Sequence, residues 1–355
     1  MVNDRTEKKS SAVAEHSRAS GDGQDSSADL VGSEKVMSRR GRSLGVDRLS
    51  GVYLFALFVV IFSIWAPSLF LTQGTLHSVA SNQSITMFLA LAALLPLVVG
   101  AFDLSIGATA NLAAVIVVLA QNDLGLGVWA SIAIAILSCF IIGFLNGFFV
   151  IKFHINSFIV TLAMTSIIAA VQTILTNGGQ PLPPASSLWN SLTQATVFGF
   201  QVIVLYMIVI TFFLWWLLEH TPTGRYMYAT GGNIDAARLS GINTEKWTWV
   251  SLVASAVIAG IGGILYSSLS GPSLTFGSGL LLPAFAAAFL GSTQIFPGRF
   301  NVWGTFIAVY VLATGIKGLQ LVTSVQWIGD MFNGVALLLA VGVAVWRRRR
   351  IEKSV

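Results

Sequence analysis

The stretch EHTPTGRYMYATGGNIDAARLSGINTEK (residues 219–246) is the one charged island within a long apolar region of this chain. Residues 51–346 carry twelve charged side chains, and six of these lie within the 28 residues of the stretch. The segments on either side are apolar and almost uncharged over lengths that suit a lipid bilayer. The stretch is therefore expected to be a polar loop that connects two membrane-spanning helices.

The second half of this stretch carries the end signals of a short helix. Asn233 is a favourable N-cap, Asp235 would lie in the first turn, where the helix dipole favours a negative charge, and Gly241 suits the left-handed conformation that ends a helix. We expect a helix of about two turns over residues 234–240. Because such a short helix is unstable alone in water, it needs a partner surface, and the stretch is expected to meet another protein.

The chain as a whole has the composition of an integral membrane protein. It is 55% hydrophobic and 10% charged, with a mean hydropathy of +0.78, whereas soluble domains average roughly 25% charged residues. The net charge of +5 comes from basic residues that flank apolar segments, so it does not indicate a nucleic-acid partner. These features argue against a soluble helical protein and predict an all-α integral membrane protein.

Ten hydrophobic segments are expected to form transmembrane helices. The eighth is short for a simple span, and is expected to be either tilted or a half-helix among its neighbours. In chain order the segments are residues 51–68, 83–101, 104–121, 127–150, 156–176, 197–218, 247–270, 279–292, 301–320 and 325–346.

Basic residues give the orientation and the domain limits. With the N-terminus in the cytoplasm, every Lys and Arg of the connecting loops falls on the cytoplasmic side, so both termini are expected there. Residues 1–50 carry nine Lys/Arg and eight Asp/Glu with few large apolar residues, which predicts a disordered cytoplasmic tail. The transmembrane domain is residues 51–346, with its cytoplasmic loop at 219–246, and residues 347–355 are a basic cytoplasmic tail.

Polar residues within the apolar segments are candidates for lining a path for a solute. Asn146 needs a hydrogen-bonding partner in hydrocarbon, and that partner is either a neighbouring helix or a polar solute. Phe158, Thr161 and Thr165 share one helical stripe, and a ring beside hydroxyls suits a polyol. Threonines in helices also bond back to their own backbone, so a packing role stays open for this stripe.

Three ionisable residues at or near the apolar segments have expected partners. Lys317 and Asp330 lie near the outer ends of adjacent segments, where each would cost a few kcal/mol if isolated, so we expect an ion pair between them. Asp103, between two segments, is expected to cap the following helix, with a role in gating as the alternative.

The outer loop over residues 177–195 is the uncharged counterpart of the 219–246 stretch. It contains three prolines and Trp189, and has no charged side chain. Such a loop is either a smooth rim that receives a partner or an ordered connector, and the sequence leaves both open.

Motifs for catalysis and for ATP binding are not found in the sequence. There is no Gly-Lys dipeptide and hence no phosphate-binding loop, so the chain is not expected to hydrolyse ATP. The four histidines are scattered singly, without metal-ligand or nucleophile–base spacing. We therefore expect no catalytic, cofactor-binding or metal-binding residues, and no enzyme activity.

Five motifs occur in the order and spacing of a known family. They are FDLSIGA (102–108), FLNGFFVIKF (144–153), SFIVTLAM (157–164), GRYMYATGGNIDAARLSGI (224–242) and VWGTFIAV (302–309). Over residues 51–346 the chain resembles the membrane permease subunit of ribose-type (carbohydrate) bacterial ABC importers, which are binding-protein-dependent inner-membrane components. The tail of residues 1–50 lies outside this resemblance.

The resemblance implies a type II-like importer permease with about ten spans in the bacterial cytoplasmic (inner) membrane. It implies three kinds of protein partner: ABC ATPase subunits, an extracytoplasmic solute-binding protein, and a second permease subunit that is identical or different. ATP and Mg would be bound by the ATPase, so no cofactor is expected in this chain. The implied ligand is a small-molecule solute.

In that family a cytoplasmic loop holds a coupling helix that fits a groove on the ATPase. The resemblance assigns this role to the 219–246 stretch, in which the paired alanines give a low profile suited to docking. The residues expected in this coupling loop are Gly224, Arg225, Tyr228, Ala229, Gly232, Asn233, Asp235, Ala236, Ala237, Arg238, Ser240 and Gly241.

Departures from the family pattern limit the substrate assignment. The apolar run LLPAFAAAFLGS (281–292) stands where relatives often carry an acidic residue, and Lys317 stands where they have Asn. The expected function is the import of a sugar or sugar-like polyol. The alternatives are a permease of the same architecture for a nucleoside or branched amino acid, and a secondary carrier.

Overall fold

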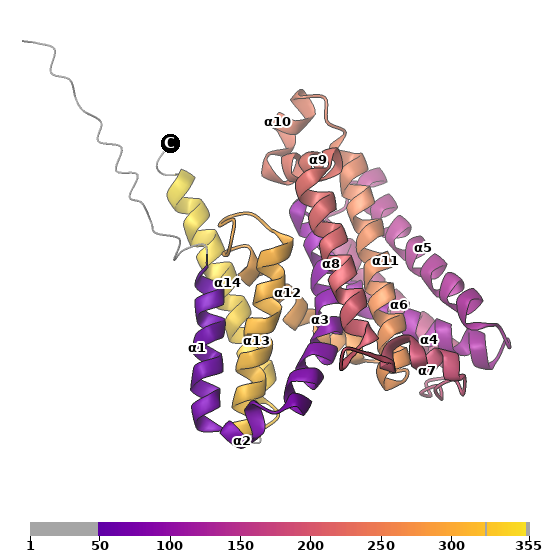
Figure 1. Ribbon diagram of the computed structural model, residues 1–355. Helices are drawn as coiled ribbons and strands as arrows, with labels where there is room; N and C mark the ends of the chain where they lie inside the picture. The colour runs from indigo at the N-terminus through magenta and orange to yellow at the C-terminus, as the bar shows by residue number, and fades with distance from the viewer. Residues whose placement is uncertain (1–48, 324, 353–355) are drawn as a thin grey trace, which may run out of the picture. The chain divides into compact units, whose positions relative to one another are not determined.

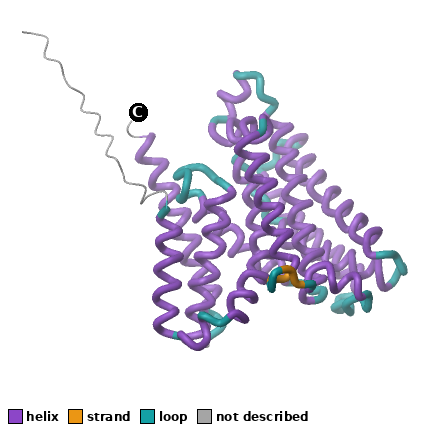
Figure 2. The backbone as a smooth tube through the Cα atoms, viewed as in Figure 1, coloured by secondary structure: helices purple, strands orange, loops and turns teal. Residues whose placement is uncertain are grey.

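The structure is a computed structural model that describes residues 49–323 and 325–352, in which loops connect helices and one short two-stranded ribbon (Figures 1 and 2). The predicted tail over residues 1–50 lies outside the described residues except for its last two, as do residues 353–355 of the predicted basic tail. The elements in chain order are α1 (Ser50–Trp65), α2 (Pro67–Phe70), α3 (Gln73–Val98), α4 (Ile106–Asn122), α5 (Val128–Lys152), α6 (Ser157–Thr176), α7 (Ser187–Gln194), β1 (Thr196–Val197), β2 (Phe200–Gln201), α8 (Val202–His220), α9 (Pro222–Gly232), α10 (Ile234–Leu239), α11 (Thr244–Ser270), α12 (Phe276–Gly291), α13 (Val302–Thr323) and α14 (Ile328–Glu352).

Each of the ten predicted hydrophobic segments coincides with a helix. Six of these helices are long and apolar enough to cross a membrane, namely α3, α5, α6, α8, α11 and α13. Helices α1, α4, α12 and the first part of α14 are apolar but shorter, and α12, the short eighth segment, has 16 residues. The helical character of the segments is confirmed, whereas ten spans and cytoplasmic termini stay predictions.

Helix α3 begins earlier than predicted. It starts at Gln73, ten residues before the expected limit of 83, because the polar run that opens it carries little hydrophobic signal. The side chain of Thr72 caps this end by accepting a hydrogen bond from the Thr75 amide at 3.1 Å. The helix is therefore 26 residues long, and its polar first part is largely exposed or half-buried, with continuous burial from Ser84 onward.

Helix α11 lies at the centre of the packing, against α3, α4 and α5 (Figure 1). Small residues permit this close approach. A Cβ atom at Gly263 would overlap the carbonyl oxygen of Ala110, and one at Gly260 would overlap the sulfur of Cys139. Close backbone contact through small residues is how membrane helices pack without a hydrophobic effect between them.

Helix α13 joins a second set of neighbours to this centre. It packs against α1, α12 and α14, and also against α3, and Figure 1 shows α1, α13 and α14 side by side. The rings of Phe58 on α1 and Phe332 on α14 lie 6.2 Å apart, and the side chain of Phe62 covers Gly318 on α13. Helices α3 and α12 therefore contact both sets.

The outer loop over residues 177–195 is an ordered connector. It forms α7, in which Trp189 is fully buried and its carbonyl oxygen accepts a hydrogen bond from Ser268 on α11 at 2.6 Å. Thr193 also bonds Ser268, at 2.8 Å. Trp189 is therefore packed inward and is not part of an exposed rim, whereas the reception of a partner by this loop stays a prediction. Exposed apolar side chains of this region include Leu182, Leu188 and Phe198. Phe198 lies at the turn of the β1–β2 ribbon, which is the one exception to the predicted all-α fold within the described residues.

Candidate coupling site

The charged stretch over residues 219–246 forms two helices, of which the sequence predicted one. The additional helix is α9, which follows α8 after a turn at Thr221. Pro222 occupies its first position, where a missing amide proton and a fixed φ are tolerated. Three glycines and the proline in its eleven residues have low helix propensity, so α9 was not predicted.

The predicted short helix is confirmed as α10, one residue shorter than expected. The side-chain oxygen of Asn233 accepts hydrogen bonds from the amides of Asp235 and Ala236 at 3.1 and 3.0 Å. After the helix, Gly241 has φ +79° and Ile242 donates its amide proton to the carbonyl of Ala237 at 3.0 Å. The start and stop signals in the sequence therefore act as predicted.

Helix α9 is seated directly on the end of α3. A Cβ atom at Gly231 would overlap the carbonyl oxygen of Val98, the last residue of α3. The chain then turns at Gly100, which has φ +81° and lies beside the Gly231 backbone. Gly232, which was expected in the coupling loop, has no atom within 4 Å of the place where a Cβ would lie. Gly231 is thus the glycine that this contact requires, and the two helix ends meet backbone to backbone.

The surface of α10 is almost entirely exposed. Of its six residues, Ala237 alone is buried, at 4% exposure. Leu239 is 91% exposed and Ile234 is 44% exposed. Exposed apolar side chains that gather in one place normally mark a contact surface. Ala236 lies on the same exposed helix. Helix α10 therefore exposes apolar side chains on more than one side, and nothing covers them among the described residues.

Charged side chains beside α10 hold the chain that leads into α11. Arg238 donates a hydrogen bond to the hydroxyl of Thr244 at 3.0 Å and lies 3.9 Å from the Glu245 carboxylate. Asn243 caps α11 by accepting a hydrogen bond from the Lys246 amide at 2.9 Å. Both ends of the α10 segment are therefore fixed by local hydrogen bonds.

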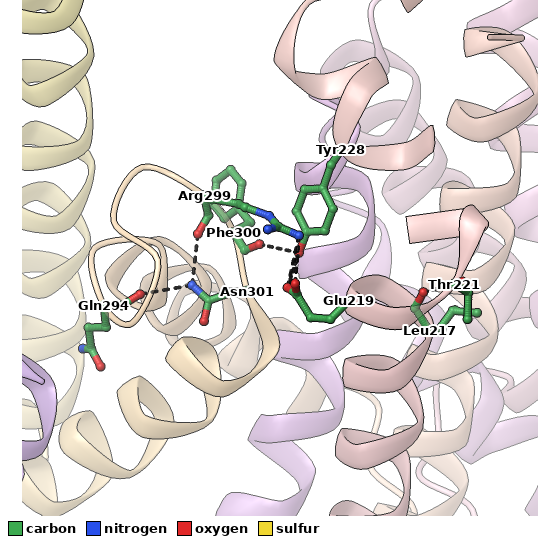
Figure 3. A network of polar contacts seen from close by, with 8 residues as sticks. All are labelled: Leu217, Glu219, Thr221, Tyr228, Gln294, Arg299, Phe300 and Asn301. Atoms are coloured by element: carbon green, nitrogen blue, oxygen red, sulfur yellow. Dashed lines mark hydrogen bonds and ion pairs between the residues drawn. The ribbon is translucent and has the colours of Figure 1, made fainter. Parts of the chain in front are cut away.

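A cluster of Glu219, Tyr228 and Arg299 ties the α8–α9 junction to the α12–α13 connection (Figure 3). The Arg299 guanidinium pairs with the Glu219 carboxylate at 3.1 Å and lies 3.6 Å from the centre of the Tyr228 ring. The Tyr228 hydroxyl donates to the carbonyl oxygen of Phe300 at 2.8 Å. One cation is thus held by a carboxylate and an aromatic face from two different helices, which fixes these helices relative to the connection.

The hydroxyl of Tyr228 keeps its proton in this cluster. Burial raises the pKa of this phenol above its ordinary value, which outweighs the opposing effect of the nearby Arg299 charge. The phenol therefore stays protonated at physiological pH and remains a hydrogen-bond donor to the Phe300 carbonyl.

Asn301 fixes the α12–α13 connection from within. Its side-chain amide donates to the carbonyl oxygens of Gly291, Gln294 and Arg299 at 3.0–3.2 Å, and its oxygen accepts from the Gly304 amide at 2.7 Å. Figure 3 shows this amide between Arg299 and Gln294. The sequence identified Arg299 only as a cytoplasmic basic residue, and its pairing with Glu219 was missed. This pair could have been suspected from the sequence, because Glu219 and Arg299 have opposite charges and lie in two loops on the same predicted side of the membrane.

The other expected coupling residues have modest structural roles. Gly224 is buried where a Cβ would overlap the carbonyl of Leu218, and Ser240 bonds back to the Ala236 carbonyl at 2.9 Å. Arg225 is exposed and Ala229 is half-buried on α9. Their part in coupling stays a prediction.

The residues proposed to line a solute path are engaged with protein groups. The hydroxyl of Thr161 is fully buried and accepts from the Leu104 amide at 3.0 Å, while the Thr165 hydroxyl bonds to the carbonyls of Thr161 and Leu104 at 2.9 and 3.3 Å. These bonds anchor the α3–α4 connection to α6. Phe158 is 48% exposed and is the member of the stripe left open to a ligand. A role of the stripe in the pathway stays a prediction.

Asp103 joins several helices and does not cap α4 itself. One carboxylate oxygen accepts from the amide and hydroxyl of Ser105 at 3.0 and 2.6 Å, and the other accepts from Ser255 on α11 at 2.9 Å. The Ser105 hydroxyl in turn accepts from Asn146 on α5 at 2.9 Å. Because α4 begins after Ser105, the bonded amide precedes the helix, and the predicted capping role is corrected to a link between α11 and the α3–α4 connection.

The expected ion pair between Lys317 and Asp330 is not formed. The described residues contain two ion pairs within 4.0 Å, Arg299–Glu219 and Arg238–Glu245. Asp330 is exposed in the first turn of α14, whereas the half-buried Lys317 lines a cavity together with Asn333 on the next turn of α14. Similar depth on adjacent helices did not suffice, since Lys317 lines the cavity whereas Asp330 is exposed and is not among the residues that line it.

Comparison with known proteins agrees with this arrangement. Residues 75–341 match the family described as "Branched-chain amino acid transport system / permease component". The "Ribose import permease protein RbsC" of Escherichia coli (strain K12) is 31% identical over 302 residues, which cover 83% of this chain and 92% of that protein. The "Autoinducer 2 import system permease protein LsrC" of Yersinia pseudotuberculosis serotype O:1b (strain IP 31758) is 29% identical over 307 residues, which cover 86% of this chain and 84% of that protein.

Proposed function

Because the chain belongs to the family of branched-chain amino acid transport system permease components, we propose that it is the permease subunit of an ATP-driven importer for a sugar or sugar-like polyol. The relatives that carry this inference are named as permeases of ribose and autoinducer-2 import systems, which confirms the resemblance to ribose-type permeases. The chain is a multi-pass permease of the bacterial inner membrane. As a transport component it performs no ATP hydrolysis, and ATP and Mg are held by separate ABC ATPase subunits.

The exposed face of α10 is the observation that supports coupling to an ATPase. Leu239 is 91% exposed, so it adds little to the packing of a six-residue helix that is marginal without a partner surface. Its small Ala236 and its apolar Leu239 and Ile234 suit insertion into a groove of a partner protein. In the proposed assembly each of two ATPase subunits receives α10 of one permease subunit, and a solute-binding protein delivers the solute on the opposite side.

Two contacts provide routes from α10 to the membrane helices. The first runs through α9 into α3, where Gly231 lies against Val98. The second runs from α9 through Tyr228 and Arg299 into the connection before α13. When ATP binding moves the ATPases, these contacts transmit a rigid displacement to the helices on both sides of α3, which switches the solute path between outward- and inward-open forms.

Substitution of Ala236 by Trp tests this proposal. The residue is exposed, so the protein is expected to fold, but the large ring obstructs docking on α10. Proteoliposomes that contain the chain, its ATPase and its binding protein are expected to lose ATP-dependent uptake of labelled D-ribose or another labelled sugar by tenfold or more, which corresponds to about 1.4 kcal/mol of docking free energy. Ala195→Trp, an exposed alanine next to α7, is the matched control and is expected to retain uptake.

Two results would contradict the proposal in different ways. Normal uptake by Ala236→Trp would show that α10 is not the element that docks on the ATPase. Uptake that continues without any ATPase indicates a secondary carrier. The family description favours one alternative substrate, a branched-chain amino acid, and ATP-dependent uptake of leucine without sugar uptake would select it.

A further inference from the structure

A polar cavity lies between α3, α12, α13 and α14, at the part of α3 that is distant from the coupling site. Its volume is about 240 Å³, and its α3 residues fall between 78 and 86, whereas Val98 at the other end of α3 contacts α9. The polar side chains that line it are Ser78, Asn82, Gln83, Thr86, Lys317, Gln320 and Asn333.

These polar side chains are left without protein partners. No side-chain hydrogen bond or ion pair joins any of the seven to another described residue. Asn333 is only 7% exposed, and its side-chain oxygen is buried with no hydrogen-bond donor. Buried polar atoms in folded proteins nearly always have a partner, and one left without a partner costs about 1–3 kcal/mol. Among the seven, the Asn333 oxygen is the buried atom without a partner, and its place in the lining of this cavity indicates that the partner is a ligand.

The charge of the lining specifies the ligand. Lys317 brings a positive charge, and the lining contains no Asp or Glu to neutralise it. Amides and hydroxyls supply the remaining polar groups, and these bind hydroxyl groups through donor and acceptor atoms alike. One wall is apolar, formed by Leu280, Pro283 and Val309 together with neighbouring aliphatic side chains. A cation, several amides and an apolar wall match a small carboxylate that carries several hydroxyls and a C–H face.

We propose that this cavity binds a small sugar acid, with the carboxylate at Lys317 and the hydroxyls at the surrounding amides. The volume equals about eight water molecules at roughly 30 Å³ each, which is room for a single five- or six-carbon solute. This inference rests on the proposed import function and narrows its substrate class to acidic polyols. It also explains why Lys317 does not pair with Asp330, because the lysine lines the cavity and its partner is the solute.

Calorimetric titration of the purified full-length chain tests the site. The protein is held in nanodiscs of zwitterionic phosphatidylcholine, so that no anionic headgroup competes for Lys317, and is titrated with D-gluconate and with the neutral sugar D-glucose. Gluconate is expected to bind at least tenfold more tightly than glucose. Lys317→Met is expected to remove this preference, Asn333→Leu to weaken gluconate binding, and Lys152→Met, an exposed lysine at the end of α5, to change neither.

The outcomes separate this inference from the proposed function. If gluconate does not bind the wild-type chain, or binds Lys317→Met equally well, the sugar-acid site is refuted, and ATP-dependent uptake of a neutral sugar would still support the importer. Tighter binding of glucose than of gluconate also refutes it. If gluconate binds through Lys317 but no solute is taken up with ATP, the site stands and the importer proposal fails.

Discussion

A methyl group added at Gly231 is expected to damage the coupling site far more than one added at the adjacent Gly232. At Gly231 the new Cβ would overlap the carbonyl oxygen of Val98, whereas at Gly232 nothing lies within 4 Å of the added atom. The two variants differ by one position in the same helix end and carry the same chemical change. Any difference between them therefore reports the contact of α9 with α3.

The magnitude follows from the kind of atom that is displaced. Overpacking of a well-packed site costs about 1–3 kcal/mol, and the upper part of this range is expected here because the obstructing atom belongs to the backbone of Val98 and cannot rotate away. Gly232→Ala removes backbone freedom from the unfolded chain without a clash, which gives up to about 1 kcal/mol of stabilisation. The two variants should therefore differ by about 2–3 kcal/mol in the free energy of unfolding.

Denaturation of the purified variants in detergent micelles measures their stability, and ATP-dependent uptake in proteoliposomes measures their transport activity. Gly231→Ala is expected to unfold at lower denaturant than wild type and to lose most uptake, because α9 is lifted from the end of α3. Gly232→Ala is expected to match or exceed wild-type stability and to keep uptake. Equal stability and uptake of the two variants, or damage confined to Gly232→Ala, would refute the direct contact of α9 with α3.

Two further predictions concern the polar contacts that position the coupling site. Arg299→Gln is expected to cost about 1–2 kcal/mol in unfolding free energy and to reduce uptake, because the half-buried Glu219 carboxylate and Tyr228 ring lose their cation. Arg238→Gln should cost less than about 1 kcal/mol, because the ion pair of Arg238 with Glu245 is exposed and 3.9 Å long. Equal losses in denaturation midpoint would contradict this ranking. Thr161→Val is expected to cost about 1–3 kcal/mol in unfolding free energy, because the part-buried amide of Leu104 loses its acceptor. The exposed Thr173→Val should stay within about 0.5 kcal/mol of wild type. Hydrogen exchange at the Leu104 amide should quicken in Thr161→Val only, and unchanged exchange there would show that this bond does not hold the α3–α4 connection.

The positions of the main helices could be predicted from the sequence, because long apolar runs have few alternatives in a bilayer. The ten predicted segments are all helical, and α10 was predicted from Asn233, Asp235 and Gly241. These features depend on local chemistry, namely hydrophobic length, an N-cap and a residue that tolerates positive φ. Helix α9 was missed for the same reason, since its proline and glycines give the opposite local signal.

Contacts between distant segments could not be predicted in this way. The pairing of Arg299 with Glu219 joins residues 80 positions apart, and the sequence around either residue does not indicate its partner. The prediction for Lys317 and Asp330 used the same information, opposite charges at similar depth, and was wrong, because depth along two helices leaves their rotation about the helix axis undetermined.

The sequence by itself determined that this chain is a multi-pass helical membrane protein, where its helices lie, and which short helix projects from it. Only the tertiary structure decided that Gly231 rather than Gly232 meets α3, that Trp189 is buried, and that Lys317 enters a polar cavity. The physical reason is that helix formation in a membrane is dictated by each segment's own polarity. The rotation of each helix, and hence the partner of each side chain, is set by close packing with its neighbours.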